Sequence, residues 1–99
     1  MPYELILHPE VLADDLKSLQ KQELELVFKQ FKKLRTSPEL GTPLGNKAGY
    51  DLRGFRKLYV DKKRIRIVYR VEEMRVVVEV VAVGKREDME VYKTAEKRQ

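Results

Sequence analysis

Apolar residues follow two different spacings along this chain, and the change between them restricts the fold more than any other feature. Up to about residue 35 they recur every three or four positions, whereas from residue 50 to 83 they alternate with polar residues. The first spacing is typical of amphipathic helices and the second of strands with one buried face. Helices followed by consecutive strands predict an α+β fold, and at 99 residues we expect one domain spanning 1–99.

The N-terminal half predicts a strand followed by a helical hairpin. Residues 3–8 suit a short N-terminal strand that Pro9 closes. Leucines at helical spacing predict a helix from Pro9 to about Gln20, and a longer apolar stripe with charged residues opposite predicts a second helix over 22–35. Several Pro and Gly residues over 36–49 predict a loop that ends the hairpin.

The C-terminal half predicts a three-stranded antiparallel meander, with turns near Lys62-Lys63 and Glu72-Glu73. Each turn fixes which residues lie opposite each other in the adjacent strands. The pairs expected across the first turn are Asp61 with Arg64, Tyr59 with Arg66, and Lys57 with Val68; those across the second are Ile67 with Val78 and Ile65 with Val80. The polar segment 85–99 is expected to form a short C-terminal helix or tail.

This register separates the meander into an apolar and a basic face, and a one-residue slip would mix the two. The helical hairpin is expected to cover the apolar face, which comprises Leu58, Val60, Ile65, Ile67, Tyr69, Val71, Val76, Val78, Val80 and Ala82. The opposite face carries Lys57, Tyr59, Arg64, Arg66, Arg70, Arg75 and Glu79, with Val68, Val77 and Val81 between them. On this register Arg66 lies opposite Glu79, so a cross-strand ion pair is one interpretation of that arginine.

Composition excludes several classes of protein and of chemistry. Apolar residues make up 42% and charged residues 37% of the chain, as in folded proteins, and no apolar run is long enough to span a membrane. The chain has no cysteine and a single histidine, so a Cys-His pair is excluded, and we interpret that histidine, His8, as a structural or surface residue. The acidic residues are scattered, and we expect no metal and no cofactor. The N-terminus has no export signal pattern, and we expect a cytoplasmic protein.

The positive charge predicts an anionic partner. The formal net charge is +5, and most charged residues between 53 and 70 are Lys or Arg. Such a face can cleave RNA without metal, because attack by the ribose 2′-OH needs only a base, charge at the phosphate and help for the leaving 5′-oxygen. Lysine can serve as the base if neighbouring cations lower its pKa, and arginine binds phosphate oxygens through its planar fork. From the pattern alone, a solvated basic face that only binds its partner is the simpler interpretation, and the charge does not distinguish RNA, DNA and an acidic protein as that partner.

Three segments of the C-terminal half resemble a known family. They are RIRIVYRV at 64–71, RVVVEVVAVGKRE at 75–87 and EVYKTAEKR at 90–98. Their ordered spacing is similar to that of the RelE toxins of type II toxin-antitoxin modules, and the predicted layout of elements agrees over essentially the full chain. The resemblance implies a metal-independent endoribonuclease that binds the ribosomal A site and cuts the mRNA there. It also implies a cognate RelB-like antitoxin that blocks the toxin by wrapping around it.

The resemblance further implies roles for single residues. Arg66 would hold the scissile phosphate, Arg86 would add a second cation or assist the leaving oxygen, and Lys57 would help to activate the 2′-OH. Tyr92 would stack on a base. Tyr59 departs from the pattern, because the best-known members have a second active-site lysine there, and an ordinary tyrosine pKa of about 10 makes it a poor base without help. The residues expected to bind RNA are Arg53, Arg56, Tyr59, Lys62, Lys63 and Arg64.

Two other functions compete with this interpretation. A ParE-like toxin shares the fold but inhibits DNA gyrase and lacks the RNA-cutting residues, whereas a noncatalytic RNA- or ribosome-binding module would need only the basic face. Arg66, Arg86 and Tyr92 together favour the ribonuclease. Structural roles also compete for single side chains, because Lys57 could be an ordinary surface lysine and Tyr92 could anchor the tail to the sheet.

Overall fold

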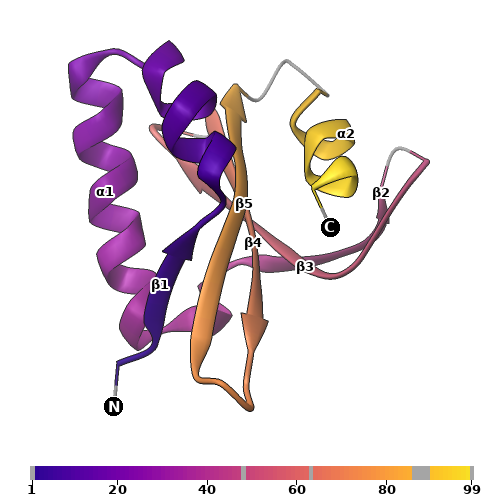
Figure 1. Ribbon diagram of the computed structural model, residues 1–99. Coiled ribbons are helices and arrows are strands. Elements are labelled where there is room, and N and C mark those ends of the chain that lie inside the picture. Colours follow the sequence, from indigo (N-terminus) through magenta and orange to yellow (C-terminus); the bar gives the residue numbers. More distant parts are fainter. Residues whose placement is uncertain (1, 48, 63, 86–89, 99) are drawn as a thin grey trace.

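The computed structural model describes residues 2–47, 49–62, 64–85 and 90–98. Its centre is a five-stranded sheet in the order β1-β5-β4-β3-β2, in which β1 runs parallel to β5 and the other neighbours are antiparallel. The strands are β1 Glu4–Leu7, β2 Thr42–Lys47, β3 Tyr50–Val60, β4 Ile65–Glu72 and β5 Val77–Lys85. Figure 1 shows α1 (Lys21–Thr36) on one side of the sheet and α2 (Glu90–Lys97) on the other. The predicted α+β class and the C-terminal helix are confirmed.

The α1 helix is the one that the apolar stripe predicts, and it extends one residue beyond the expected range at each end. It begins with a capping box, in which the Gln20 N–H donates to Glu23 Oε1 at 2.8 Å. Glu23 also accepts a hydrogen bond from Lys85 on β5, which holds the pKa of the Glu23 carboxyl below its usual range. This second bond ties the start of α1 to the end of β5.

The segment before α1 is helical, but it is not the regular helix expected over 9–20. It consists of a wide π turn, Val11–Asp15, and a tight 3₁₀ turn, Leu16–Ser18. The Leu16 N–H donates to the Val11 carbonyl five residues back, and the Leu19 N–H donates to the Leu16 carbonyl three residues back. The buried side chains Val11, Leu16 and Leu19 follow the same two intervals, whereas Leu12, one of the leucines at helical spacing that predict the regular helix, is 55% exposed.

The segment expected to be a loop over 36–49 contains the edge strand β2. A 3₁₀ turn, Pro38–Leu40, precedes the strand, which pairs with β3 and shifts its register between Pro43 and Gly45. An edge strand tolerates both residue types, because one of its sides forms no bonds to a neighbouring strand. The loop prediction is therefore wrong for residues 42–47.

The predicted pairing of β3 with β4 is confirmed, whereas that of β4 with β5 is wrong. Tyr59 lies opposite Arg66, as expected. The second turn, however, falls at residues 73–76, and Val76 lies in it with φ at 55° instead of on the apolar face. Ile67 consequently pairs with Val83 instead of Val78.

This change of register gives Arg66 a different neighbour. Glu79 lies opposite Arg70 and forms an ion pair with it at 2.7 Å. Arg66 lies opposite Gly84. The cross-strand pair of Arg66 with Glu79 is therefore excluded as an interpretation of that arginine.

A β-bulge in β5 moves its side chains between the two faces of the sheet. The pairing with β4 shifts at Val81, which has no Cα partner there. Val81 and Ala82 both belong to the buried cluster on the α2 side, while Val80 and Val83 belong to the cluster on the α1 side. Ala82 was expected on the hairpin face, and the bulge is the reason that this expectation is wrong.

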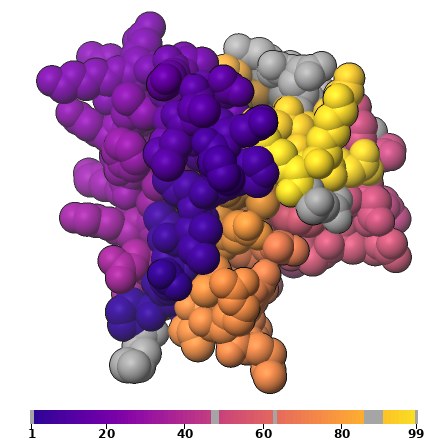
Figure 2. Space-filling model, in the orientation of Figure 1, coloured from indigo at the N-terminus to yellow at the C-terminus, as the bar shows by residue number. Residues whose placement is uncertain are grey.

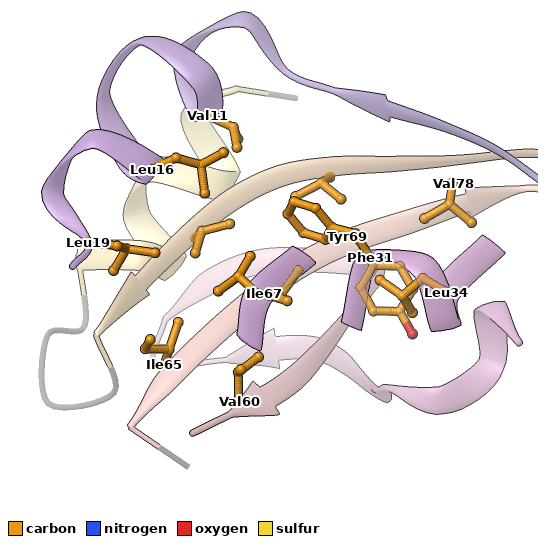
Figure 3. Packing of buried hydrophobic residues seen from close by; sticks show 13 residues of the cluster. Val11, Leu16, Leu19, Phe31, Leu34, Val60, Ile65, Ile67, Tyr69 and Val78 are labelled. Atoms are coloured by element: carbon orange, nitrogen blue, oxygen red, sulfur yellow. The ribbon is translucent and has the colours of Figure 1, made fainter. Parts of the chain in front are cut away.

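Two buried clusters lie on opposite faces of the sheet. Figure 3 shows side chains from the helical segments and from the strands meeting in the first. The second lies between the sheet and α2 and consists of Leu52, Phe55, Val68, Val81, Ala82, Val91, Tyr92 and Ala95. The α2 helix therefore covers part of the face that the sequence predicts to be basic and open.

Asp15 ties three segments together at the bulge. Its Oδ2 atom accepts hydrogen bonds from the Val83 N–H and from Arg98 Nη1, each at 2.9 Å. Arg98, whose side chain is 9% exposed, also donates to the Val81 carbonyl at 2.8 Å. These bonds satisfy backbone groups at the bulge and hold the end of α2 beside the N-terminal helical segment, next to which α2 lies in Figure 2.

Replacing Asp15 by asparagine is expected to lower the free energy of unfolding by about 2 kcal/mol, because the buried Arg98 side chain then loses its closer ion pair and keeps the longer one, with Glu10 at 3.5 Å. Chemical denaturation at neutral pH measures the change. Asp14→Asn is the matched control, since Asp14 is exposed, and this variant is expected to stay within about 0.5 kcal/mol of the wild type. Equal losses in the two variants would contradict the stabilising role of Asp15.

Candidate active site

The candidate site lies where β3 and β4 pair, on the face that α2 partly covers. Lys57 and Tyr59 are two residues apart on β3, so their side chains point to the same side of the sheet. Arg66 on β4 lies directly opposite Tyr59. The strand register thus brings these three side chains together, and α2 adds Tyr92 from the C-terminal end of the chain.

Arg66 is buried at this site, with 8% of its surface exposed. Its guanidinium carbon lies 4.8 Å from the ring centroid of Tyr92 and 5.9 Å from that of Tyr59. A cation at such distances is attracted to the negative face of an aromatic ring, so the two tyrosines stabilise the charge and restrict its position. In this partly desolvated setting the guanidinium attracts an anion more strongly than it would in water.

Gly84 permits the close approach of α2 to Arg66. A Cβ atom at Gly84, which pairs with Arg66 across the strands, would lie 3.2 Å from the Cβ atom of Val91 on α2. That distance is tighter than nine in ten real Cβ contacts, so α2 would have to move outward. The absence of a side chain at Gly84 therefore helps to place the neighbouring Tyr92 ring against the guanidinium.

The ammonium group of Lys57 lies beside the hydroxyl of Tyr59. Lys57 Nζ donates a hydrogen bond to Tyr59 Oη at 3.0 Å and lies 4.9 Å from the ring centroid. The hydrogen bond from Lys57 is the largest of the effects that hold the pKa of Tyr59 below its usual value, and the positive charges of Lys57 and Arg66 act in the same direction. Burial opposes them without reversing the result.

Tyr92 is fully buried against Arg66 and the second cluster. Among the residues that the structure describes, none forms a hydrogen bond with its hydroxyl. In this conformation the ring anchors α2 to the sheet, which is the structural role considered from the sequence. Stacking on a base would require the same ring to become exposed.

The other predicted RNA-binding residues do not all lie together. Arg53 is exposed and paired with Asp51 at 2.8 Å, and Arg56 donates to the Gly41 carbonyl at 2.7 Å. Both cations are thus engaged in contacts within the protein. Lys62 and Arg64 are exposed at the turn between β3 and β4. Arg86 and Lys63 lie outside the described residues.

Sequence reasoning missed the residues that pack against the backbone of Lys57. The Gly41 N–H donates to Tyr69 Oη at 2.7 Å, and the Tyr69 hydroxyl donates to the Pro38 carbonyl at 2.8 Å. A Cβ atom at Gly41 would lie 2.5 Å from the backbone oxygen of Lys57. Tyr69 was assigned to the apolar face, and only its hydroxyl signals that a polar partner must lie within the core.

Tyr59 is expected to ionise at lower pH than Tyr3 and Tyr69. A hydrogen bond to Glu73 raises the pKa of Tyr3, and burial raises the pKa of Tyr69, whereas Lys57 lowers that of Tyr59. Titration of the native protein followed by tyrosinate absorbance measures this order. Tyr59→Phe should remove a transition that lies below those of Tyr3 and Tyr69, and Lys57→Met should move that transition upward; a transition unchanged in both variants would contradict the assignment.

The described residues contain neither a cluster of metal-binding side chains nor a membrane-spanning helix. Within 2–47, 49–62, 64–85 and 90–98, no three His, Asp or Glu side chains come together in a group that could hold a metal ion. No helix in the same part of the chain is long and apolar enough to cross a membrane.

The fold and the site together describe a small α+β protein in which a buried arginine lies near two tyrosine rings. A lysine donates a hydrogen bond to one of those tyrosines. The family model described as "ParE toxin of type II toxin-antitoxin system, parDE" matches residues 5–90. The chain therefore belongs to the RelE/ParE superfamily of toxins of type II toxin-antitoxin systems. No curated protein sequence matches the chain significantly.

Solved structures of RelE toxins share the fold. A double mutant of the Escherichia coli toxin RelE in the free state is 31% identical, with a TM-score of 0.73 over 99% of this chain and 98% of that one. The toxin–antitoxin complex RelBE of E. coli matches at 26% identity and a TM-score of 0.68, over 84% of this chain and 95% of that one. The RelBE2 complex of Mycobacterium tuberculosis, at 23% identity and a TM-score of 0.72 over 87% of this chain and 100% of that one, shares the fold. The resemblance to RelE that the sequence predicts is confirmed.

Proposed function

We propose that this toxin is a ribosome-dependent endoribonuclease that cuts mRNA in the ribosomal A site without a metal ion, in the cytoplasm. The observation that carries the proposal is the setting of Arg66, which is buried and lies near the rings of Tyr59 and Tyr92. A surface that only binds nucleic acid needs exposed cations, whereas burying a guanidinium costs solvation energy. A desolvated, restrained cation is the arrangement that stabilises charge in a transition state.

In the proposed reaction the ribose 2′-OH attacks the adjacent phosphate. Arg66 binds the phosphate and offsets the negative charge that develops on it. Lys57, which has three donor hydrogens, stabilises the developing charge on the 2′-oxygen while one of them is bonded to Tyr59. Arg86 supplies a further cation or assists the leaving oxygen. Tyr92 holds Arg66 in the conformation described here, and it stacks on a base once its ring is exposed.

Binding to the ribosome and to mRNA is proposed for the exposed cations around the site. Lys62 and Arg64 are exposed at the turn between β3 and β4, and Lys63 lies between them in the sequence. Arg53 and Arg56 lie further along β3 and would need to exchange their internal partners for phosphate. These contacts would add affinity that falls as the salt concentration rises.

A RelB-like antitoxin is the proposed partner that inhibits the toxin. The solved E. coli RelBE complex contains a toxin chain of which this chain covers 95%. Coexpression with the product of a short adjacent reading frame should restore growth and yield a complex on purification. Continued growth arrest with that product present would contradict this partner.

A ParE-like inhibitor of DNA gyrase is the second candidate, because the matching family model carries the ParE description. One pair of assays on the purified protein separates the candidates. We expect cleavage of mRNA on ribosomes with a filled P site and an open A site, and no inhibition of supercoiling by purified gyrase. Inhibited supercoiling with intact mRNA would favour the ParE-like function, and salt-sensitive ribosome binding without cleavage would favour a noncatalytic module.

A further inference from the structure

The Tyr59 hydroxyl has a setting that none of the roles above explains. Its oxygen accepts a hydrogen bond from Lys57 Nζ at 3.0 Å, and the guanidinium carbon of Arg66 lies 5.9 Å from the centroid of its ring. The residue is only partly buried and lies on the same sheet face as Lys57, directly opposite Arg66. We propose that Tyr59 is the general acid of the site, which gives its proton to the 5′-oxygen that leaves. This inference rests on the proposed ribonuclease function.

The hydrogen bond from Lys57 and the nearby charge of Arg66 favour an acid over a base. A phenol oxygen that accepts a hydrogen bond from one cation and lies near a second is a poor acceptor for the proton of a 2′-OH, because both positive charges disfavour its protonation. Its own hydrogen is the part of the group that can be given up, and the phenolate that remains is stabilised by the same two cations. The lowered pKa of Tyr59 means that the phenol gives up its proton more readily than an ordinary tyrosine does.

The proposed step balances without a further reactant. The 2′-oxygen forms its bond to phosphorus and its proton passes to water, while the bond from phosphorus to the 5′-oxygen breaks. The electron pair of the broken bond stays on the 5′-oxygen, which takes the proton of Tyr59. Water then returns a proton to the phenolate, and the products are a 2′,3′-cyclic phosphate and a 5′-hydroxyl. Arginine is poorly suited to this transfer, because it keeps its proton throughout the physiological range.

An mRNA with sulfur in place of the 5′-oxygen at the cleavage site tests the inference. A thiolate leaves without protonation, so the modified mRNA no longer needs an acid. On ribosomes carrying the ordinary mRNA, Tyr59→Phe is expected to slow cleavage by about 100-fold or more, and on the sulfur-containing mRNA it should cut at nearly the wild-type rate. The variant keeps the aromatic ring beside Arg66 and is expected to fold. Tyr50→Phe, a change of the same kind on the same strand, is the control and should cut both mRNAs like the wild type.

Each alternative outcome has a different meaning. An equal slowing of Tyr59→Phe on both mRNAs would overturn the acid role and leave Tyr59 as a positioning residue for Arg66. Wild-type rates on the ordinary mRNA would overturn it as well. If the wild-type protein cuts neither mRNA, the proposed function itself fails, and the inference fails with it.

Discussion

Replacing Arg66 by alanine is expected to slow cleavage of A-site mRNA by about 1,000-fold, because the reaction loses the buried cation that offsets charge on the phosphate. Arg66→Lys should be slowed by at least about 100-fold as well. Lysine keeps the charge but lacks the planar fork that binds two phosphate oxygens and that lies over the Tyr92 ring in Arg66. Single-turnover cleavage on programmed ribosomes, with saturating toxin, measures both rates.

Arg70→Ala is the matched control for this prediction. Arg70 is an arginine on the same strand and on the same face, but it is paired with Glu79 and Glu72 and is more exposed. We expect this variant to keep cleavage within about threefold of the wild type, since an exposed ion pair contributes little. Cleavage by both Arg66 variants at the rate of Arg70→Ala would contradict the role assigned to Arg66.

Replacing Gly41 by alanine is expected to lower the free energy of unfolding by about 3 kcal/mol. The added Cβ atom would lie 2.5 Å from the Lys57 backbone oxygen and 2.6 Å from the Tyr69 hydroxyl, both of which are held in place by the sheet. Relieving the clash must lengthen the hydrogen bonds of Tyr69 to Gly41 and Pro38 in the core. Because β3 moves with the Lys57 carbonyl, we also expect slower mRNA cleavage.

Thr42→Ala is the control for Gly41→Ala. Thr42 is the next residue, it is exposed and it lies opposite Lys57 in the pairing of β2 with β3. The control should unfold within about 0.5 kcal/mol of the wild type in the same denaturant titration. A Gly41→Ala protein as stable as the control would contradict this prediction. It would mean that the chain can move away from Lys57 with little loss of folding free energy.

The alternation of polar and apolar residues explains why one strand register could be predicted and the other could not. On β3 and β4 the two kinds alternate strictly around Tyr59 and Arg66, so a slip would bury charge, and the predicted pairs are confirmed. From Val76 to Val83 almost every residue is apolar, and both faces of β5 are buried under helices. Such a strand fits several registers equally well, and the bulge at Val81 carries no sequence signal of its own.

The contacts of the candidate site could be predicted only where they depend on the register of β3 and β4. The proximity of Arg66 to Tyr59, and of Lys57 to both, follows from the confirmed register. The contact of Tyr92 with Arg66 depends on where α2 docks, and the docking depends on side chains far apart in the sequence, such as Asp15 and Arg98. Neither the strand β2 nor the close approach of Gly41 to the Lys57 backbone could be predicted, because proline and glycine at an edge strand resemble a loop.

The chemical ends of cleaved mRNA test the central claim most directly. Ribosomes programmed with a defined mRNA, with the A site open, are incubated with the wild-type toxin, and both fragments are mapped. We predict a 2′,3′-cyclic phosphate on the upstream fragment and a 5′-hydroxyl on the downstream one, and neither fragment with Arg66→Ala. Fragments with a 3′-hydroxyl and a 5′-phosphate, or intact mRNA with the wild-type toxin, would contradict a metal-independent ribonuclease built around Arg66.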